Sequence, residues 1–319
     1  MFAGVLLSNI AVLILISIVF YLLSNYLGYS SEELYSNMWI IYLNSFLCEI
    51  AFLTLYLIYN KVQKVDFYTA SRISPKFDRK IAFAVAGLSV LVFFVSLNFT
   101  NMFNFFANTI SPSTSRGGVP LDNLWQLLLS VLLFAVLPAV CEELVFRGVI
   151  YNGLRRKFNA KLSIILSTIV FMIIHFSIYQ TFHQLILGVV LGCLVYFTGS
   201  IVYGMIFHFV NNLIVLLLTY FSSVGAFLTF SSFGVLNILI TILIFALGAV
   251  AVAYFFVVLS RYTKKHKNYL NLEKDSKKIE TNDKNENAEA VRTKKTDVIY
   301  FVLTMVVCVI LWLFNSFGG

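Results

Sequence analysis

The chain has 319 residues, of which 60% are hydrophobic and 12% are charged, and its formal net charge is +8. Its mean hydropathy of +0.87 lies far above that of a soluble globular protein. The composition therefore excludes a soluble enzyme and indicates a polytopic membrane protein.

Apolar runs long enough to cross a bilayer recur along the whole chain. A helix of about 20 apolar residues spans the hydrocarbon core. The runs lie near residues 4–24, 39–60, 81–100, 124–146, 162–179, 184–198, 201–220, 235–260 and 298–316. The first run has no basic segment before it and no Ala-x-Ala cleavage site, so we interpret it as a retained helix. We expect an all-α transmembrane helix bundle with about nine spans, eight to nine.

Basic residues indicate how the bundle is oriented, because short loops rich in Lys and Arg stay in the cytoplasm. Six lie between Lys61 and Lys80, five between Arg147 and Lys161, and eleven between Arg261 and Lys295. Nine spans with a cytoplasmic N-terminus place all three segments inside and the C-terminus outside. The positive charge is thus largely a topology signal, together with attraction to anionic lipid, and gives little reason to expect nucleic acid.

The most unusual residues of the chain are Glu142 and Glu143, near the end of the fourth apolar run, and Arg147, which follows that run directly. Ionisable groups at membrane depth are costly and need a partner, a cavity or a function. Residues four apart share a helix face, so Glu143 can pair with Arg147, and Glu142 is left as the freer carboxylate. An ion cluster that only holds helices together is the alternative. Repulsion between adjacent buried carboxylates is, however, a common way to prepare a general acid or base.

Three polar residues in later runs are expected near this carboxylate. His175 follows Lys161 by 14 residues, and Glu142 lies a similar length from Arg155, so both lie about 20 Å from the cytoplasmic ends of their helices. His208 and Asn212 are four residues apart and project from one face. Interhelical hydrogen bonding would be the alternative role for either residue.

Close helix packing is expected before these two residues. The segment Gly188-Val189-Val190-Leu191-Gly192 is a G-x-x-x-G motif, which lets another backbone approach. A tight turn is expected at Thr198-Gly199-Ser200.

The stretches EELVFRGVIYNGLRRKF, STIVFMIIH and LILGVVLGCLVYFTGSIVYGMIFHFVNN resemble the three signature regions of the CAAX protease and bacteriocin-processing (CPBP, or Abi) family. This family includes the type II CAAX prenyl endopeptidases. The resemblance covers about residues 124–218. The pattern E-E-x-x-x-R, F-x-x-x-H, H-x-x-x-N is complete here, in Glu142, Glu143, Arg147, Phe171, His175, His208 and Asn212.

The resemblance implies an intramembrane endopeptidase that forms no covalent intermediate. Glu142, assisted by His175, would activate water, and His208 and Asn212 would stabilise the oxyanion. Glu143 and Arg147 would hold the helix and tune the base. A zinc ion held by Glu142, His175 and His208 remains the alternative, since family members are described both as metalloproteases and as metal-independent. We expect no obligatory metal.

Combined with composition, the resemblance divides the chain into five segments. They are N-terminal transmembrane helices at 1–120, a catalytic core at 121–220, a further transmembrane helix at 221–260, a charged cytoplasmic linker at 261–297 and a C-terminal transmembrane helix at 298–319.

The expected partners are the lipid bilayer of the cell membrane and a membrane-associated peptide or protein substrate. The resemblance implies the processing of prenylated C-termini, peptide pheromones or bacteriocin precursors. Residue usage typical of an AT-rich bacterial genome favours peptide maturation or immunity over eukaryotic-type prenyl processing.

A non-proteolytic immunity or scaffold protein is the main alternative. A transporter would favour two matching halves, and the sequence shows no internal repeat.

The topology predicts that residue 285 faces the cytoplasm. A cysteine introduced as Asn285→Cys should resist a membrane-impermeant maleimide in intact cells and react after permeabilisation. Reaction from outside intact cells would contradict the nine-span arrangement.

Overall fold

The regular elements of this chain are helices. The computed structural model describes residues 2–30, 33–34, 37–63, 77–110, 121–230, 232–266 and 295–317. No strand occurs in these ranges, which confirms the predicted all-α class. The elements are α1 (Phe2–Leu27), α3 (Met38–Gln63), α5 (Arg79–Ile110), α6 (Leu124–Ser130), η1 (Val131–Val136), α7 (Leu137–Glu143), η2 (Leu144–Tyr151), α8 (Asn152–Arg155), α9 (Ala160–Ile173), α10 (Ile178–Thr198), α11 (Ile201–Tyr220), α12 (Ser222–Leu228), α13 (Val235–Lys265) and α16 (Lys295–Phe317).

Six of the described helices are long and apolar enough to cross a membrane. They are Met38–Val62, Arg79–Ile110, Leu124–Arg155, Ile178–Thr198, Ile201–Tyr220 and Val235–Lys265. Three shorter apolar helices, Ile10–Tyr26, Ala160–Ile173 and Phe301–Leu313, coincide with the other predicted runs. The protein is thus a multi-pass membrane protein, and the count of about nine spans stays a prediction.

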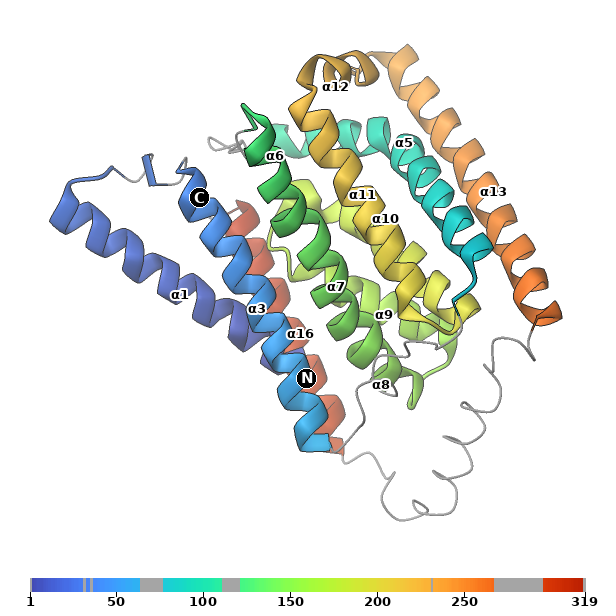
Figure 1. Ribbon diagram of the computed structural model, residues 1–319, viewed down its shortest axis with the longest axis horizontal. Coiled ribbons are helices and arrows are strands. Elements are labelled where there is room, and N and C mark those ends of the chain that lie inside the picture. Colours follow the sequence, from blue (N-terminus) through green and yellow to red (C-terminus); the bar gives the residue numbers. More distant parts are fainter. Residues whose placement is uncertain are drawn as a thin grey trace.

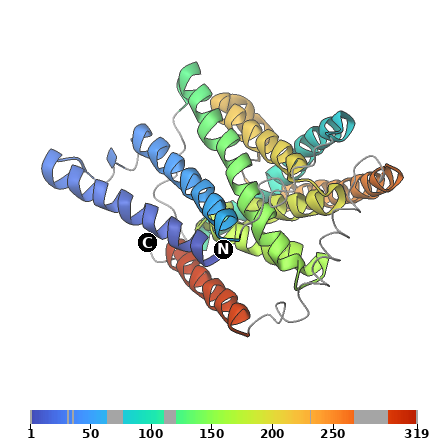
Figure 2. The same cartoon turned by 60° about the horizontal axis from the view of Figure 1, so that its bottom comes forward.

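The helices are arranged around a central group formed by α6–α8 and α9–α11, with α1 and α13 at opposite edges (Figures 1 and 2). The outer helix α13 exposes large apolar side chains, including Val250 and Tyr254, which are each 68% exposed. Such a surface would aggregate in water and suits lipid. Because α13 continues to Lys265, the first residues of the predicted linker are helical. Residues 267–294 of that linker lie outside the described residues.

The segment from α6 to α8 is one continuous rod whose hydrogen-bond pattern changes along its length. It begins at Asn123, whose side chain accepts a hydrogen bond from the backbone N–H of Gln126. The elements η1 and η2 are π-helical, and α7, which carries both glutamates, lies between them. π-Helical turns inside α-helices are frequent at functional sites. No sequence signal predicted them.

The helices α9 and α10 correct the predicted boundaries of two runs. The runs were expected at 162–179 and 184–198, whereas α9 ends at Ile173 and α10 begins at Ile178. The 14 residues of α9 extend only about 21 Å, less than the roughly 30 Å hydrocarbon core. The turn after α9 is therefore expected within the membrane, where irregular backbone is tolerated only inside protein or along a cavity.

The predicted close approach at the G-x-x-x-G motif is confirmed. A Cβ atom on Gly188 would lie 2.8 Å from Thr168 Cγ2, and one on Gly192 would lie 2.9 Å from Ile164 Cγ2. Both contacts are with α9, so the two glycines let α9 and α10 pack tightly. The expected turn also forms, with Gly199 at φ 71° between α10 and α11.

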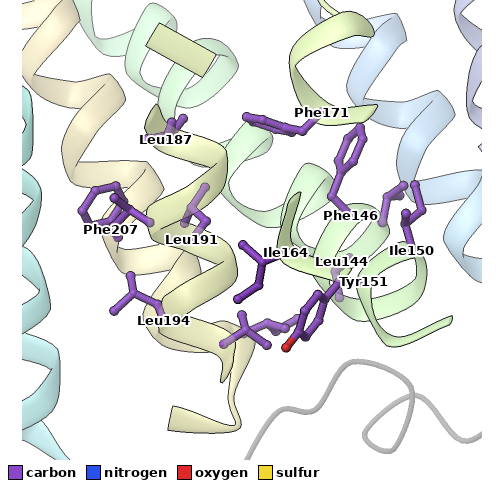
Figure 3. Close-up of a cluster of buried hydrophobic side chains, with 14 of the residues drawn as sticks. Leu144, Phe146, Ile150, Tyr151, Ile164, Phe171, Leu187, Leu191, Leu194 and Phe207 are labelled. Carbon is purple, nitrogen blue, oxygen red and sulfur yellow. The ribbon is translucent and has the colours of Figure 1, made fainter. Parts of the chain in front are cut away.

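The largest cluster of buried apolar side chains lies around these central helices. Figure 3 shows Phe146 and Phe171 close together, with Leu187, Leu191 and Leu194 along α10. All five side chains are buried. Polar groups placed inside this cluster are consequently surrounded by hydrocarbon.

A polar contact ties α5, α11 and α13 together at the start of α5. The backbone N–H of Asp78 donates to Tyr203 Oη at 2.9 Å, and Tyr262 Oη donates to Asp78 Oδ2 at 2.9 Å. Burial alone would raise the pKa of Asp78, but hydrogen bonds from Tyr262 and from the N–H groups of Lys80 and Ile81, with the charge of Lys80, hold this pKa below its ordinary value. The ionised form of Asp78 therefore stabilises the folded state.

A carboxylate whose pKa is lowered by folding contributes stability at neutral pH, and this contribution is lost as the pH falls below about 4. Asp78→Asn should lower the unfolding free energy at neutral pH by about 1 kcal/mol, the usual value of a hydrogen bond. Thermal unfolding in detergent should show a smaller loss of Tm upon acidification for Asp78→Asn than for wild type. Equal acid sensitivity of the two proteins would contradict this assignment.

Candidate active site

The predicted pairing of Glu143 with Arg147 is confirmed. Arg147 Nη1 donates to Glu143 Oε1 at 2.6 Å, and the two side chains are 1% and 0% exposed. The guanidinium also lies 4.4 Å from the centre of the Phe171 ring, and its Nη2 donates to the Gly188 carbonyl at 3.4 Å. Arg147 thus links η2 to α9 and α10 through charge, cation–π contact and hydrogen bonding.

A histidine from α11 joins the same carboxylate. His208 Nδ1 lies 3.3 Å from Glu143 Oε1, and the ring is 2% exposed. The contact requires space on α11, because a Cβ atom on Gly204 would lie 2.9 Å from Glu143 Oε2. Since a carboxylate accepts hydrogen bonds, Nδ1 of His208 carries a hydrogen and Nε2 is the nitrogen left for other chemistry.

Glu142 makes no hydrogen bond with this pair, and it lies nearest the other nitrogen of the His208 ring. Its side chain is 10% exposed, and its Oε2 lies 3.8 Å from His208 Nε2, beyond hydrogen-bond distance. This oxygen is buried without a hydrogen-bond partner among the described residues. A buried carboxylate in that condition is a candidate for binding water or substrate.

The sequence predicted that His175 lies within a helix. In the structure it lies in the turn after α9, which ends at Ile173. Its Nδ1 is 2.7 Å from the Phe171 carbonyl oxygen. Because a carbonyl only accepts, Nδ1 donates, and Nε2 is available as a base or acceptor. Phe176, with φ 46°, is the one described non-glycine residue in the left-handed region, so strained backbone adjoins His175. His175 and Glu142 are close enough to interact electrostatically.

Phe171 organises the polar residues around it. Its ring contacts His175 edge-on at a centroid distance of 5.0 Å and His208 at 6.0 Å. Together with the guanidinium of Arg147 on its face, this places α9, α11 and η2 around one aromatic ring. Phe171 is fully buried, so it fixes these groups without exposing them to water.

Asn212 has a backbone partner that the sequence did not reveal. Its Nδ2 donates to the Phe134 carbonyl of η1 at 3.0 Å. Four residues after Phe134 comes Pro138, which has no N–H for that carbonyl. One N–H of Asn212 therefore supports the irregular helix, and the second N–H on the same nitrogen is available for another acceptor.

The alternative zinc ligands Glu142, His175 and His208 do not form a metal-binding arrangement. Throughout the described residues, no group of three His, Cys, Asp or Glu side chains is placed to hold a metal ion. The set therefore does not fit a zinc site in this conformation.

Sequence reasoning missed two residues near this site. Glu49 of α3 is 5% exposed and interacts electrostatically with Glu142. His183 of α10 lies near His175 and His208. The predicted runs at 162–179 and 184–198 leave it between two helices, whereas α10 begins at Ile178. The signal for Glu49 was a single acidic residue inside an apolar run.

Comparison with known protein families gives one match. Residues 124–214 match the family model described as type II CAAX prenyl endopeptidase Rce1-like. This confirms the predicted resemblance. The matched segment extends from α6 into α11 and contains all six predicted site residues, whereas Glu49 lies outside it. No curated protein and no solved structure matches the chain.

Substitutions should separate the roles of the two neighbouring carboxylates and their arginine. Arg147→Ala leaves Glu143 without its cation in the core and should lower the unfolding free energy by about 3 kcal/mol or more. Glu142→Gln removes no ion pair within hydrogen-bond distance and should leave the amount of folded protein and its Tm nearly unchanged. Fluorescence-detected size exclusion and thermal unfolding measure both quantities. Equal destabilisation by the two substitutions would contradict the assignment.

Proposed function

We propose that this protein is an intramembrane endopeptidase that hydrolyses a peptide bond of a membrane-associated peptide or protein. The observation that carries the proposal is the buried Oε2 of Glu142, which has no hydrogen-bond partner among the described residues and lies beside the Glu143–Arg147 ion pair. The match of residues 124–214 to a family of peptidases supports this reaction class.

Glu142 acts as the general base. A water bound to its free oxygen gives up a proton, and the hydroxide attacks the carbonyl carbon of the scissile bond. Because Nδ1 of His175 carries the hydrogen that it donates to the Phe171 carbonyl, Nε2 keeps a free lone pair. This nitrogen accepts a hydrogen bond from the same water and orients it. The proton on Glu142 then passes to the leaving nitrogen as the C–N bond breaks.

His208 and Asn212 stabilise the oxyanion. Because Nδ1 of His208 donates to Glu143, donation from Nε2 to the oxyanion requires a proton on both ring nitrogens. In that state Nδ1–H of His208 keeps its contact with Glu143 Oε1. The second N–H of Asn212 supplies another donor, and such donors act strongly where water is scarce.

The residues also explain why an apolar environment can hold this chemistry. With His208 protonated, two carboxylates, Glu142 and Glu143, face two cations, Arg147 and His208. Their formal charges sum to zero, so the site avoids an uncompensated charge in the membrane.

A non-proteolytic immunity or scaffold protein of the same family is the second candidate. It is favoured by the structural use of Asn212, whose amide supports the Phe134 carbonyl. In that case the polar residues brace the bundle, and Glu142→Gln should leave the cellular phenotype intact.

The two candidates are distinguished by the peptide termini found in membranes. Cells expressing wild type should contain membrane-peptide termini, identified by mass spectrometry, that cells expressing Glu142→Gln lack. Glu33→Gln, an equivalent substitution at an exposed glutamate, is the matched control and should retain these termini. Identical termini in all three, at equal protein levels, would rule out the peptidase.

Purified protein then tests the oxyanion donor and the absence of an obligatory metal. With a peptide identified in this way, Asn212→Ala should reduce kcat by about 10²-fold or more with little change in KM. Treatment with a chelator should preserve most wild-type activity. Loss of activity on chelation and its return with zinc would contradict the metal-free mechanism.

A further inference from the structure

A third buried carboxyl group, which the proposed mechanism does not use, lies on α3. Glu49 is the single acidic residue of that helix, and its side chain is 5% exposed. Its Oε2 is buried and has no hydrogen-bond partner among the described residues. An isolated carboxylate is expensive at membrane depth, so this group needs a partner or a proton.

Contacts on both sides of Glu49 determine what it faces. Ser45, Glu49 and Phe52 recur at spacings of four and three residues, which puts them on one face of α3. Ser45 Oγ donates to the Leu133 carbonyl at 3.1 Å. The Phe52 ring lies 6.0 Å from the Phe146 ring. This face of α3 therefore runs in the same direction as the rod from η1 to η2.

Glu49 comes between these two contacts, so it faces the middle of the rod, which is α7 near Cys141 and Glu142. The electrostatic neighbours agree with this register. Cys48 on α3 and Cys141 on α7 each lie near both Glu49 and Glu142. Figure 1 shows α3 alongside α7 in the bundle.

Among the described residues packed along α3, no free cation is placed to neutralise Glu49. The elements packed along α3 are α1, η1, α7 and η2. Among their residues α1 and η1 carry no charged group, α7 contributes Cys141, Glu142 and Glu143, and η2 contributes Arg147. Arg147 is already paired with Glu143. Two carboxylates in a medium of low dielectric constant rarely both ionise.

We propose that Glu49 remains protonated and donates a hydrogen bond from its carboxyl group to Oε2 of Glu142. Neither oxygen has a hydrogen-bond partner among the described residues. Because a carboxylate oxygen has two lone pairs, Oε2 of Glu142 accepts this bond and still binds the water. The bond holds Glu142 in its ionised form and in one orientation. This proposal rests on the proposed function of Glu142 as the base.

Glu49 is a positioning residue in this scheme, because its proton is not consumed. Glu142 takes the proton that is transferred from water, the oxygen–carbon bond forms, and the same proton leaves with the nitrogen. Throughout these steps Glu49 keeps its own proton and its bond to Glu142.

The protonation of Glu49 can be measured without any substrate. The infrared spectrum of the purified full chain at neutral pH should contain the C=O stretching band of a protonated carboxylic acid, sensitive to exchange into D₂O. This band should be absent from Glu49→Gln and present in Ser45→Ala, a matched change one turn away on the same helix face. Absence of the band in wild type, or its persistence in Glu49→Gln, overturns the proposal independently of whether the protein is a peptidase.

The pH dependence of kcat/KM tests the effect of Glu49 on the base. The amide of Glu49→Gln also donates a hydrogen bond, so this variant should keep most of its activity at neutral pH and the acidic limb of the wild-type profile. Glu49→Leu has no donor, and its acidic limb should move to higher pH by about one to two units, the equivalent of one hydrogen bond to a charged group. An unchanged acidic limb in folded Glu49→Leu overturns the proposal. If this variant does not fold, the infrared comparison decides.

Discussion

The ion pair between Glu143 and Arg147 is the interaction on which the central bundle depends. Both side chains are removed from solvent, and neither charge could remain there alone. The Arg147 guanidinium that neutralises Glu143 also contacts Phe171 of α9 and the Gly188 carbonyl of α10. The same side chain therefore fixes η2, α9 and α10 relative to one another. The pair therefore links the energetics of the fold to the geometry of the site.

The irregular backbone of this protein is concentrated where the polar residues lie. Both glutamates lie between two π-helical segments, Pro138 leaves a carbonyl that Asn212 occupies, and His175 lies in a turn beside the strained Phe176. Unpaired backbone groups are costly in lipid. These departures from regular helix persist because neighbouring side chains supply the missing hydrogen bonds inside the protein.

Apolar packing and electrostatics have complementary roles in the proposed chemistry. The glycines that let α9 and α10 approach, and the absence of a side chain at Gly204, bring His208, Glu143 and Arg147 within contact. In such an environment each charge influences its neighbours over several ångströms. Oε2 of Glu142 has no hydrogen-bond partner among the described residues, and this is the carboxylate to which we assign the proposed chemistry.

The sequence by itself determined the class of the protein, because apolar runs of about 20 residues can only be helices in a membrane. It also determined the pairing of Glu143 with Arg147, since residues four apart in a helix are neighbours. The resemblance of about residues 124–218 to a peptidase family was likewise read from the sequence, and a family model matches residues 124–214. Only the tertiary structure decided that α9 stops before His175, that Asn212 supports Phe134, and that Glu49 faces α7. These features depend on helix register and on contacts between distant segments, which local periodicity does not encode.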